Sequence, residues 1–124
     1  MVVHNAGLMP PERTESPQGH ELTMAVHVLG PVLMTDLLRP ALSDGARIIL
    51  VTSGGMYAQK LRADDPEYVT GDYSPTTAYA RSKRAQVELL PILGERWGDG
   101  VLVHATHPGW ADTPGVEESL PSFR

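Results

Sequence analysis

Two short apolar runs constrain the fold of this 124-residue chain more than any other feature. Arg-Ile-Ile-Leu-Val at positions 47–51 ends at Thr-Ser-Gly-Gly, and Val-Leu-Val-His-Ala at positions 101–105 is soon followed by His-Pro-Gly. Continuous apolar runs of this length are typical of strands that are buried on both faces of a parallel sheet. Residues 1–4, Met-Val-Val-His, resemble the end of a third strand.

A helical pattern fills the interval between the first two strands, after a polar loop over about residues 5–19. Apolar residues recur there at three- and four-residue steps and form one stripe, made of Leu22, Val26, Leu29, Leu33 and Leu37. Gly30-Pro31 lies inside this stripe and should kink or split the helix. Turn residues at positions 43–45 should close the segment.

A long polar loop follows the second strand, and its acidic stretch at positions 64–67 is expected to be solvated. The next helix should begin at Ser74-Pro75, an N-cap followed by proline at the first helical position, and Pro91 should kink or end it. Alternating strands and helices are typical of a doubly wound α/β sheet. We therefore predict one partial α/β domain over residues 1–124, a Rossmann-like parallel sheet of about three strands with two main helices.

Composition narrows the classes of function. The net charge of −5 and the absence of a basic segment argue against nucleic acid as a partner. Without cysteine, the chain has no disulfides and no thiolate chemistry. No apolar run approaches the ~20 residues of a membrane span and no secretory signal begins the sequence, so we expect no membrane partner and a cytoplasmic location.

The five histidines show neither a His-x-x-x-His pair nor a cluster with carboxylates. They are His4, His20, His27, His104 and His107. We therefore expect no metal site, and we place every histidine except His27 at the surface or in a turn.

The strongest chemical pattern combines Tyr79 and Lys83, early in the second helix, with Ser53 at a strand end. A spacing of four puts the tyrosine and the lysine on one helix face. A neighbouring ammonium favours the phenolate form of a tyrosine, which suits proton transfer to or from a hydroxyl or carbonyl. Ser53 would hydrogen-bond the substrate oxygen and hold it against the phenol.

Taken alone, Tyr-x-x-x-Lys is more typical of a solvated helix face than of a site. Its position changes this interpretation. Ser53, Asn-Ala-Gly at positions 5–7 and Pro-Gly at positions 108–109 all follow the ends of strands. Ligands of open α/β sheets bind at the carboxyl ends of the strands. The sequence therefore predicts an active site at this edge.

Five segments resemble, in order, the landmarks of the short-chain dehydrogenase/reductase family. They are His-Asn-Ala-Gly at 4–7, Val-His-Val-Leu-Gly at 26–30, Arg-Ile-Ile-Leu-Val-Thr-Ser at 47–53, Tyr-Ala-Arg-Ser-Lys at 79–83 and His-Pro-Gly-Trp-Ala-Asp-Thr-Pro-Gly at 107–115. The resemblance spans nearly the whole chain. The stretch from Thr52 through Trp110-Ala111-Asp112-Thr113 is similar in particular to the dehydrogenase/reductase member twelve-like subgroup, and it shares the long loop of that subgroup before the tyrosine helix.

The resemblance implies hydride transfer between NAD or NADP and a carbonyl/alcohol pair of a small-molecule substrate. Tyr79 would be the acid/base, Lys83 would favour its phenolate and bind the nicotinamide ribose, and Ser53 would orient the substrate. Family members commonly pair through the helices that carry His27 and Tyr79, so a homo-oligomer is expected. The choice between NAD and NADP stays open.

The resemblance also implies the residues that contact the cofactor. Asn5, Ala6 and Gly7 would form the turn that lines its adenine side, whereas Pro108, Gly109 and Thr113 would face the nicotinamide. The phosphate-binding Gly-rich turn of the family belongs before Asn5, and the sequence does not contain it. We therefore interpret the chain as the catalytic C-terminal portion of such a domain, without the Gly-rich half and without the last elements.

One further departure concerns His27, which occupies the position of an asparagine that in the family helps to hold a water in a proton relay behind the lysine. Either a ring nitrogen of His27 serves this relay or the relay is impaired. Two alternatives to a dehydrogenase stay open. One is a non-catalytic truncated remnant that at most associates with partners. The other, an extended-type sugar epimerase, is less favoured because of the Asn-Ala-Gly and Pro-Gly loops.

Overall fold

A single parallel sheet of three strands is the centre of the computed structural model, which describes residues 1–110, 114 and 117. The strands are β1 (Val2–His4), β2 (Ala46–Val51) and β3 (Val101–Thr106), and β2 lies between the other two. In register, Val3 lies beside Ile49, and Ile49 lies beside His104. The expected three-stranded, Rossmann-like parallel sheet is confirmed.

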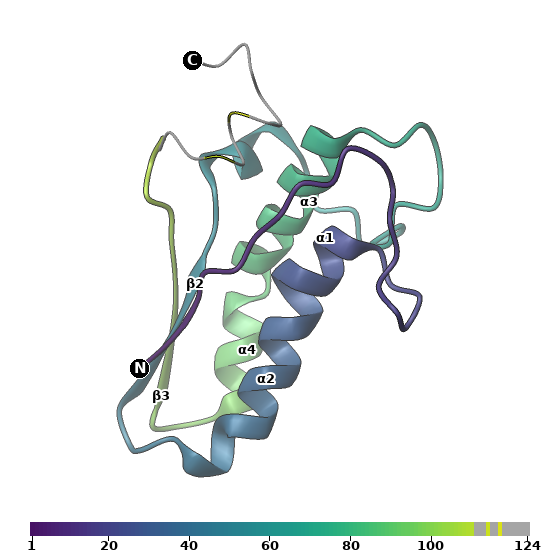
Figure 1. Ribbon diagram of the computed structural model, residues 1–124. Coiled ribbons are helices and arrows are strands. Elements are labelled where there is room, and N and C mark those ends of the chain that lie inside the picture. Colours follow the sequence, from purple (N-terminus) through teal and green to yellow (C-terminus); the bar gives the residue numbers. More distant parts are fainter. Residues whose placement is uncertain (111–113, 115–116, 118–124) are drawn as a thin grey trace.

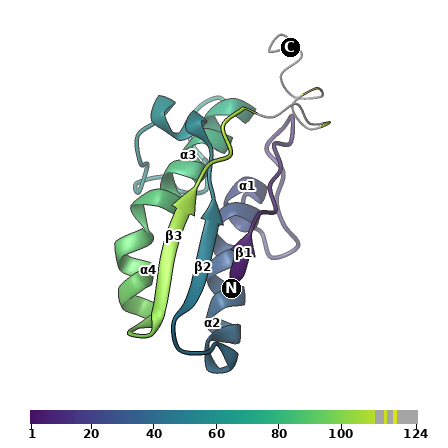
Figure 2. The same cartoon turned by 90° about the vertical axis from the view of Figure 1, so that its left-hand side faces the viewer.

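All the long helices lie on one side of this sheet, as Figures 1 and 2 show from two directions. The first helical segment consists of α1 (Leu22–Met24), the π-helical turn η1 (Ala25–Leu29), α2 (Gly30–Leu38) and the 3₁₀ turn η2 (Arg39–Ala41). The second consists of the 3₁₀ turn η3 (Gly54–Ala58), α3 (Pro75–Glu88) and α4 (Leu90–Trp97).

The two faces of the sheet differ in burial. Ile48 and Leu50 point toward the helices, where they are 0% and 2% exposed and pack with Leu93 and Trp97 of α4. On the opposite face Leu102 is 49% exposed. The expectation of strands buried on both faces is therefore wrong for the described residues, because an apolar run shows no alternation from which a bare face could be recognised.

The first helical segment packs with a different face from the one that its apolar stripe suggests. Four of its five buried residues follow a four-residue step, namely Thr23, His27, Pro31 and Thr35, and the fifth is Val28. Two members of the stripe, Leu33 and Leu37, are 60% and 73% exposed. The polar side chains are buried because they have partners across the interface: Thr35 Oγ1 lies 2.8 Å from the ring of His4, which is itself 9% exposed. The surface position expected for His4 is wrong for this reason.

Residues Leu22–Ala41 form one helical run of 20 residues, which is long and apolar enough to cross a membrane: the mean hydropathy over an 18-residue stretch of it is 1.3. The sequence-based expectation of no such run is wrong, because Gly30-Pro31 does not interrupt it. Within the chain, this run is tied to α4 through Asp36, whose carboxylate accepts hydrogen bonds from Arg96 and from the indole of Trp97. Core helices pass the same test of length and composition, so the finding carries little weight about a membrane.

Proline explains why the first segment contains a π-helical turn. Pro31 has no N–H, so it cannot donate to the carbonyl of His27 four residues earlier. Gly30 instead donates to Ala25, and the amide of Gln86 on α3 donates to the carbonyl of His27 at 2.7 Å. The break predicted at Gly30-Pro31 is thus a change of helical hydrogen bonding that α3 completes.

The second helix begins and ends where the sequence predicts. The hydroxyl of Ser74 caps α3 by accepting from the amide of Thr77 at 3.3 Å. Pro91 is the second residue of α4, and α3 ends at Glu88. Both expectations are confirmed.

Two long loops lie side by side at the end of the helices opposite η2, as Figure 1 shows. The guanidinium of Arg13 donates to the backbone carbonyls of Glu67 and Tyr68 and joins the two loops. Asp65 is 6% exposed and accepts from the amides of Val69 and Thr70. The acidic stretch at 64–67 is therefore an ordered turn at this residue and not the solvated loop that was expected.

Candidate active site

The first turns of α3 place Tyr79 and Lys83 at the carboxyl end of β2. Lys83 is 3% exposed, and its Nζ donates to the carbonyl of Val51 at 2.8 Å. In return, Thr52 Oγ1 donates to the backbone carbonyl of Lys83 at 3.0 Å. These two bonds dock the helix on the strand end. The ammonium lies 5.6 Å from the centroid of the Tyr79 ring.

Both groups keep hydrogen-bonding capacity toward a ligand. Among the described residues, nothing hydrogen-bonds the hydroxyl of Tyr79, and the carbonyl of Val51 is the one acceptor bound by the ammonium of Lys83. An ammonium carries three N–H donors, so two of them are available to other acceptors. A free phenol beside a partly used ammonium suits a ligand with an oxygen at each.

Burial lowers the pKa of Lys83 to about 8, because it separates the ammonium from water. The side chain is therefore mostly charged at neutral pH.

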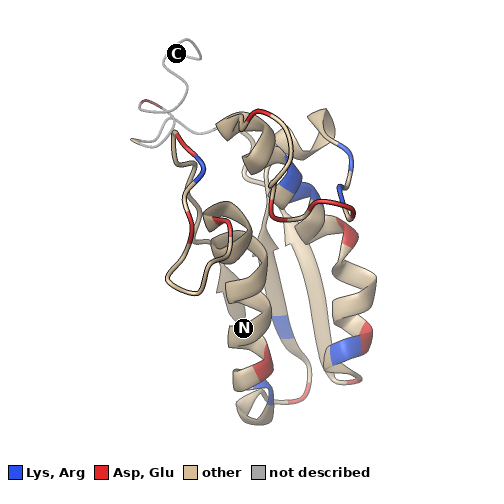
Figure 3. Cartoon of the chain, turned by 90° about the vertical axis from the view of Figure 1, so that its right-hand side faces the viewer, with Lys and Arg blue, Asp and Glu red and all other residues tan. Residues whose placement is uncertain are grey.

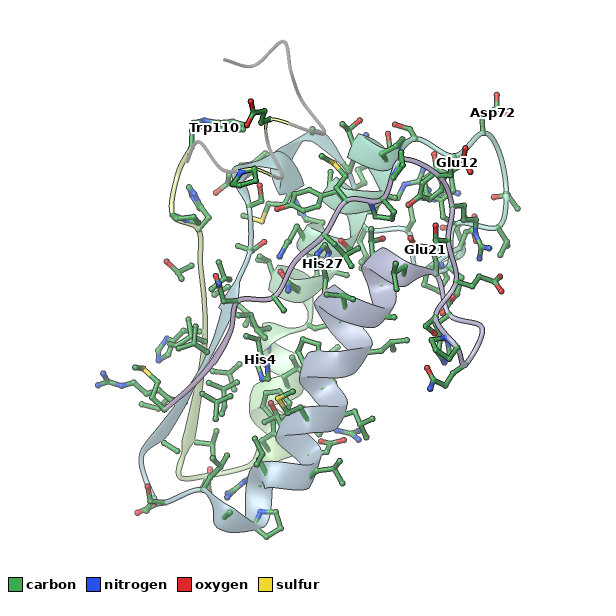
Figure 4. All side chains as sticks on the ribbon, viewed as in Figure 1. His4, Glu12, Glu21, His27, Asp72 and Trp110 are labelled. Atoms are coloured by element: carbon green, nitrogen blue, oxygen red, sulfur yellow. The ribbon has the colours of Figure 1, made fainter. Side chains whose placement is uncertain are left out.

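His27 lies fully buried between the first loop and α3, and Figure 4 shows it beneath the segment that follows β1. Its Nε2 accepts from the amide of Leu8 at 3.1 Å, and its Nδ1 lies 2.7 Å from the hydroxyl of Ser82. Its ring meets that of Tyr79 edge to face, with centroids 5.3 Å apart. Burial, and to a lesser degree the charge of Lys83, lowers the pKa of His27 to about 3, so the imidazole is neutral at physiological pH.

Tyr79, Lys83 and His27 form a corner at the carboxyl end of β2, and the Asn-Ala-Gly turn reaches this corner through Gly7. A Cβ on Gly7 would lie 3.3 Å from Nε2 of His27 and 3.9 Å from Nζ of Lys83. Asn5 and Ala6 are exposed, directly after β1. The structure thus brings Gly7, His27 and Lys83 together.

The remaining predicted site residues lie at the same edge of the sheet without a direct bond to this group. Ser53 caps η3, and its hydroxyl accepts from the amide of Gly55 at 3.2 Å. Pro108 and Gly109 are exposed and follow β3. Thr113 lies outside the described residues.

Sequence analysis missed Ser82 and Glu21. Ser82 lies inside the motif, three residues after Tyr79, and its hydroxyl donates to the carbonyl of Tyr79 at 2.7 Å. The only sequence signal for Ser82 was its spacing of three residues from Tyr79, which places the two on neighbouring turns of a helix. Glu21 precedes α1 at the position of an N-cap, which glutamate rarely occupies, so its type gave no signal.

Glu21 forms a second buried polar centre. It is 1% exposed, and its carboxylate accepts from the amides of Thr23 and Met24 and from the hydroxyls of Thr23 and Tyr73. Its own amide donates to the carboxylate of Glu67 at 2.6 Å. This centre ties the loop between η3 and α3 to the start of α1. Burial, followed by the charge of Glu21, raises the pKa of Tyr73.

Across residues 1–110, 114 and 117, no group of three histidine, aspartate or glutamate side chains is arranged to hold a metal ion. The acidic residues lie mainly on the loops, and within α2 only Asp36 is charged (Figure 3). The chemistry of the corner therefore depends on Tyr79, Lys83 and the groups that hold them.

The model of the NAD dependent epimerase/dehydratase family matches residues 1–107. The chain belongs to this family. It is 39% identical over 128 aligned residues to "Dehydrogenase/reductase SDR family member 12" of Bos taurus, which covers 99% of this chain and 39% of that protein. The chain thus spans about two fifths of the length of this relative.

Two crystal structures share the fold. One, from Mycobacterium paratuberculosis, has a TM-score of 0.75 and 30% identity over 90% of this chain and 42% of its own. The other, a short-chain dehydrogenase/reductase from Brucella melitensis, has a TM-score of 0.69 and 21% identity over 97% of this chain and 44% of its own. Together with the relative, they confirm the resemblance to the short-chain dehydrogenase/reductases that the sequence motifs carried.

Proposed function

We propose that the chain carries the catalytic portion of an NAD(P)-dependent dehydrogenase/reductase that interconverts a carbonyl and an alcohol, with Tyr79 as the acid/base. One observation carries the proposal. The phenol hydroxyl of Tyr79 has no partner among the described residues, and the buried, charged ammonium of Lys83 lies 5.6 Å from the centroid of its ring. A buried tyrosine usually has a partner for its hydroxyl, whereas Tyr79 is half-buried and keeps its hydroxyl open to a ligand.

In the reducing direction, a bound nicotinamide supplies the hydride to the carbonyl carbon. The hydroxyl of Tyr79 donates a proton to the carbonyl oxygen and becomes a phenolate, which the charge of Lys83 stabilises. Ser53 would hydrogen-bond the same oxygen and orient it. In the oxidising direction, the phenolate takes the proton back from the alcohol.

The residues of the corner fit the nicotinamide-ribose end of NAD or NADP. Two N–H donors of Lys83 are available for ribose hydroxyls, and the absence of a side chain at Gly7 leaves its backbone open beside Lys83. Asn5 and Ala6 are proposed on the adenine side. Pro108, Gly109 and Thr113 are proposed on the nicotinamide side.

Two alternatives compete with this proposal. The family model covers epimerases, which share Ser and Tyr-x-x-x-Lys, but the Bos taurus relative is named a dehydrogenase/reductase, which favours the redox function. The second alternative is a non-catalytic protein that at most associates with partners. Cofactor binding separates this second alternative from an enzyme.

A homo-oligomer is also proposed, with pairing through α2 and α3. The support is the apolar surface of α2, where Leu33, Met34 and Leu37 are 60%, 52% and 73% exposed. Contiguous exposed apolar side chains on a helix are typical of an interface.

The test has two measurements. Fluorescence and calorimetry measure the binding of NADH and NADPH to this chain, and an activity assay measures the reduction of a panel of carbonyl compounds. We expect saturable binding. Tyr79→Phe should keep this binding and lower the reduction rate by about 10²–10⁴-fold, the usual contribution of a general acid. Tyr57→Phe is the matched control, because Tyr57 is 73% exposed, and it should change neither quantity. Absence of binding to the wild-type chain would support the non-catalytic alternative.

A further inference from the structure

The hydrogen bonds around His27 form a directed chain with fixed ends. The amide of Leu8 can only donate, so Nε2 of His27 accepts and carries no proton. In a neutral imidazole the proton is then on Nδ1, which donates to the hydroxyl of Ser82. That hydroxyl donates to the backbone carbonyl of Tyr79 at 2.7 Å.

This series of hydrogen bonds has no titratable group at either end, because it begins at a backbone amide and finishes at a backbone carbonyl. Both nitrogens of the His27 ring are in use, and the ring is fully buried. The carbonyl of His27 is in use as well, since it accepts from Gln86 at 2.7 Å. The ammonium of Lys83 donates to Val51 at the strand end and not to the imidazole. His27 therefore offers no vacant atom through which a proton could leave Lys83.

We infer that His27 is a positioning residue and not a proton relay: as the Nδ1–H tautomer it couples the turn at residues 5–8 to the first turns of α3. This inference rests on the proposed function, in which that turn contacts the cofactor and α3 carries Tyr79. The ring of His27 also limits the rotation of the Tyr79 ring, because the two meet edge to face at 5.3 Å. A shift of the turn is thus transmitted to the acid/base.

The close approach of the turn supports this role. A Cβ on Gly7 would lie 3.3 Å from Nε2 of His27, a distance shorter than an ordinary van der Waals contact. The amide of Leu8 reaches the imidazole because the preceding residue lacks a side chain. Glycine at 7 and histidine at 27 act as one unit.

Two substitutions at His27 separate its two bonds. An asparagine amide nitrogen occupies the place of Nδ1, so His27→Asn keeps a donor for Ser82 but has no atom near Leu8. A glutamine oxygen reaches the place of Nε2, so His27→Gln keeps the acceptor for Leu8 and loses the donor for Ser82. Both side chains are neutral amides, which makes each variant the control of the other.

The readout is hydrogen exchange of the Leu8 amide in the chain without cofactor, measured by NMR. We expect His27→Asn to speed this exchange about tenfold, the value of one lost hydrogen bond, and His27→Gln to leave it near that of the wild type. Equal exchange rates in the two variants would overturn the inference. The chemical shifts of the ring nitrogens in the wild type provide a second measurement that needs no variant. A proton on Nε2 would also overturn it.

Cofactor binding then connects the coupling to function. His27→Gln, which keeps the turn in place but cannot pass a proton through an imidazole, should retain NADH or NADPH affinity and carbonyl reduction better than His27→Asn. A changed pH dependence of reduction in His27→Gln, with full cofactor binding, would show a relay and overturn the inference. If the wild type binds neither cofactor, the proposed function fails, whereas the exchange result still decides whether His27 holds the turn.

Discussion

Glu21 and His27 lie six residues apart, are both buried, and each joins a loop to a helix, yet they hold their loops in different ways. Glu21 accepts four hydrogen bonds from protein donors and fixes the loop that precedes α3. His27 has one acceptor and one donor at its ring and fixes the turn that follows β1.

The difference concerns what each group has for a neighbour. The proposed acid/base and the ammonium of Lys83 both lie beside His27, so the position of its ring is coupled to the site. The hydroxyl of Tyr73, in contrast, donates its proton within the protein, to the carboxylate of Glu21. Glu21 is therefore a structural centre, because the groups around it use their hydrogen bonds within the protein. His27 belongs to the proposed site, because the neighbouring Tyr79 keeps a hydroxyl without a partner among the described residues.

Loss of Glu21 is expected to have the largest effect. Glu21→Ala leaves buried donors of Thr23, Met24 and Tyr73 without an acceptor and removes the cap of α1, so the free energy of unfolding should fall by about 3 kcal/mol. Urea denaturation measures it. Glu15→Ala is the control, since the Glu15 side chain is 53% exposed, and should change the free energy by less than about 0.5 kcal/mol. Equal losses would show that Glu21 is no structural centre.

Acid should act through His27 with a smaller effect. Its pKa is about 3 in the folded chain and 6.5 in the unfolded chain, so between these values the unfolded state binds more protons. Stability is therefore complete above pH 6.5 and declines as the pH falls, by about 1.4 kcal/mol per pH unit, or about 2 kcal/mol at pH 5. Urea denaturation of the wild type and His27→Asn across this range checks it. Parallel curves for the two proteins would contradict the assignment.

The smallest expected effect is that of a methyl group at Gly7. Gly7→Ala places a Cβ 3.3 Å from the imidazole, and a neighbour must move by a few tenths of an ångström, at a cost of about 1 kcal/mol. Gly54→Ala is the matched control, because its Cβ would meet nothing within 4 Å. Thermal unfolding should distinguish the two variants. A melting temperature for Gly7→Ala at or above that of Gly54→Ala would show that the turn is not held against His27.

The sequence predicted the strands, the start of α3 and the break at Pro91, because each depends on local residue types. It also predicted that residues of the turn, of the β2 end and of α3 converge, since parallel strands end at one edge. It did not predict which face of the first helix is packed. Thr23 and Thr35 look like surface residues until their partners across the interface are known, and Leu37 looks like a core residue.

The charged and polar residues of the site were likewise predictable only where their arrangement depends on local sequence. Tyr79 and Lys83 were recognisable from their spacing, whereas the use of both nitrogens of His27 depends on Leu8 and Ser82, which approach from distant parts of the chain. Glu21 was missed because its partners come from Tyr73 and Glu67, about 50 positions further along. Tertiary partners of buried polar groups leave no periodic signal in a sequence.

The missing N–H of Pro31 sets the alignment of two helices. Pro31 cannot donate to the carbonyl of His27, which instead accepts from the amide of Gln86 on α3. Sliding α3 along the first helix by one turn, about 5.4 Å, would strand that carbonyl in the interior. The two helices therefore pack at a single alignment along their axes. Any motion that opens this corner must tilt or separate the helices, since it cannot shift them lengthwise.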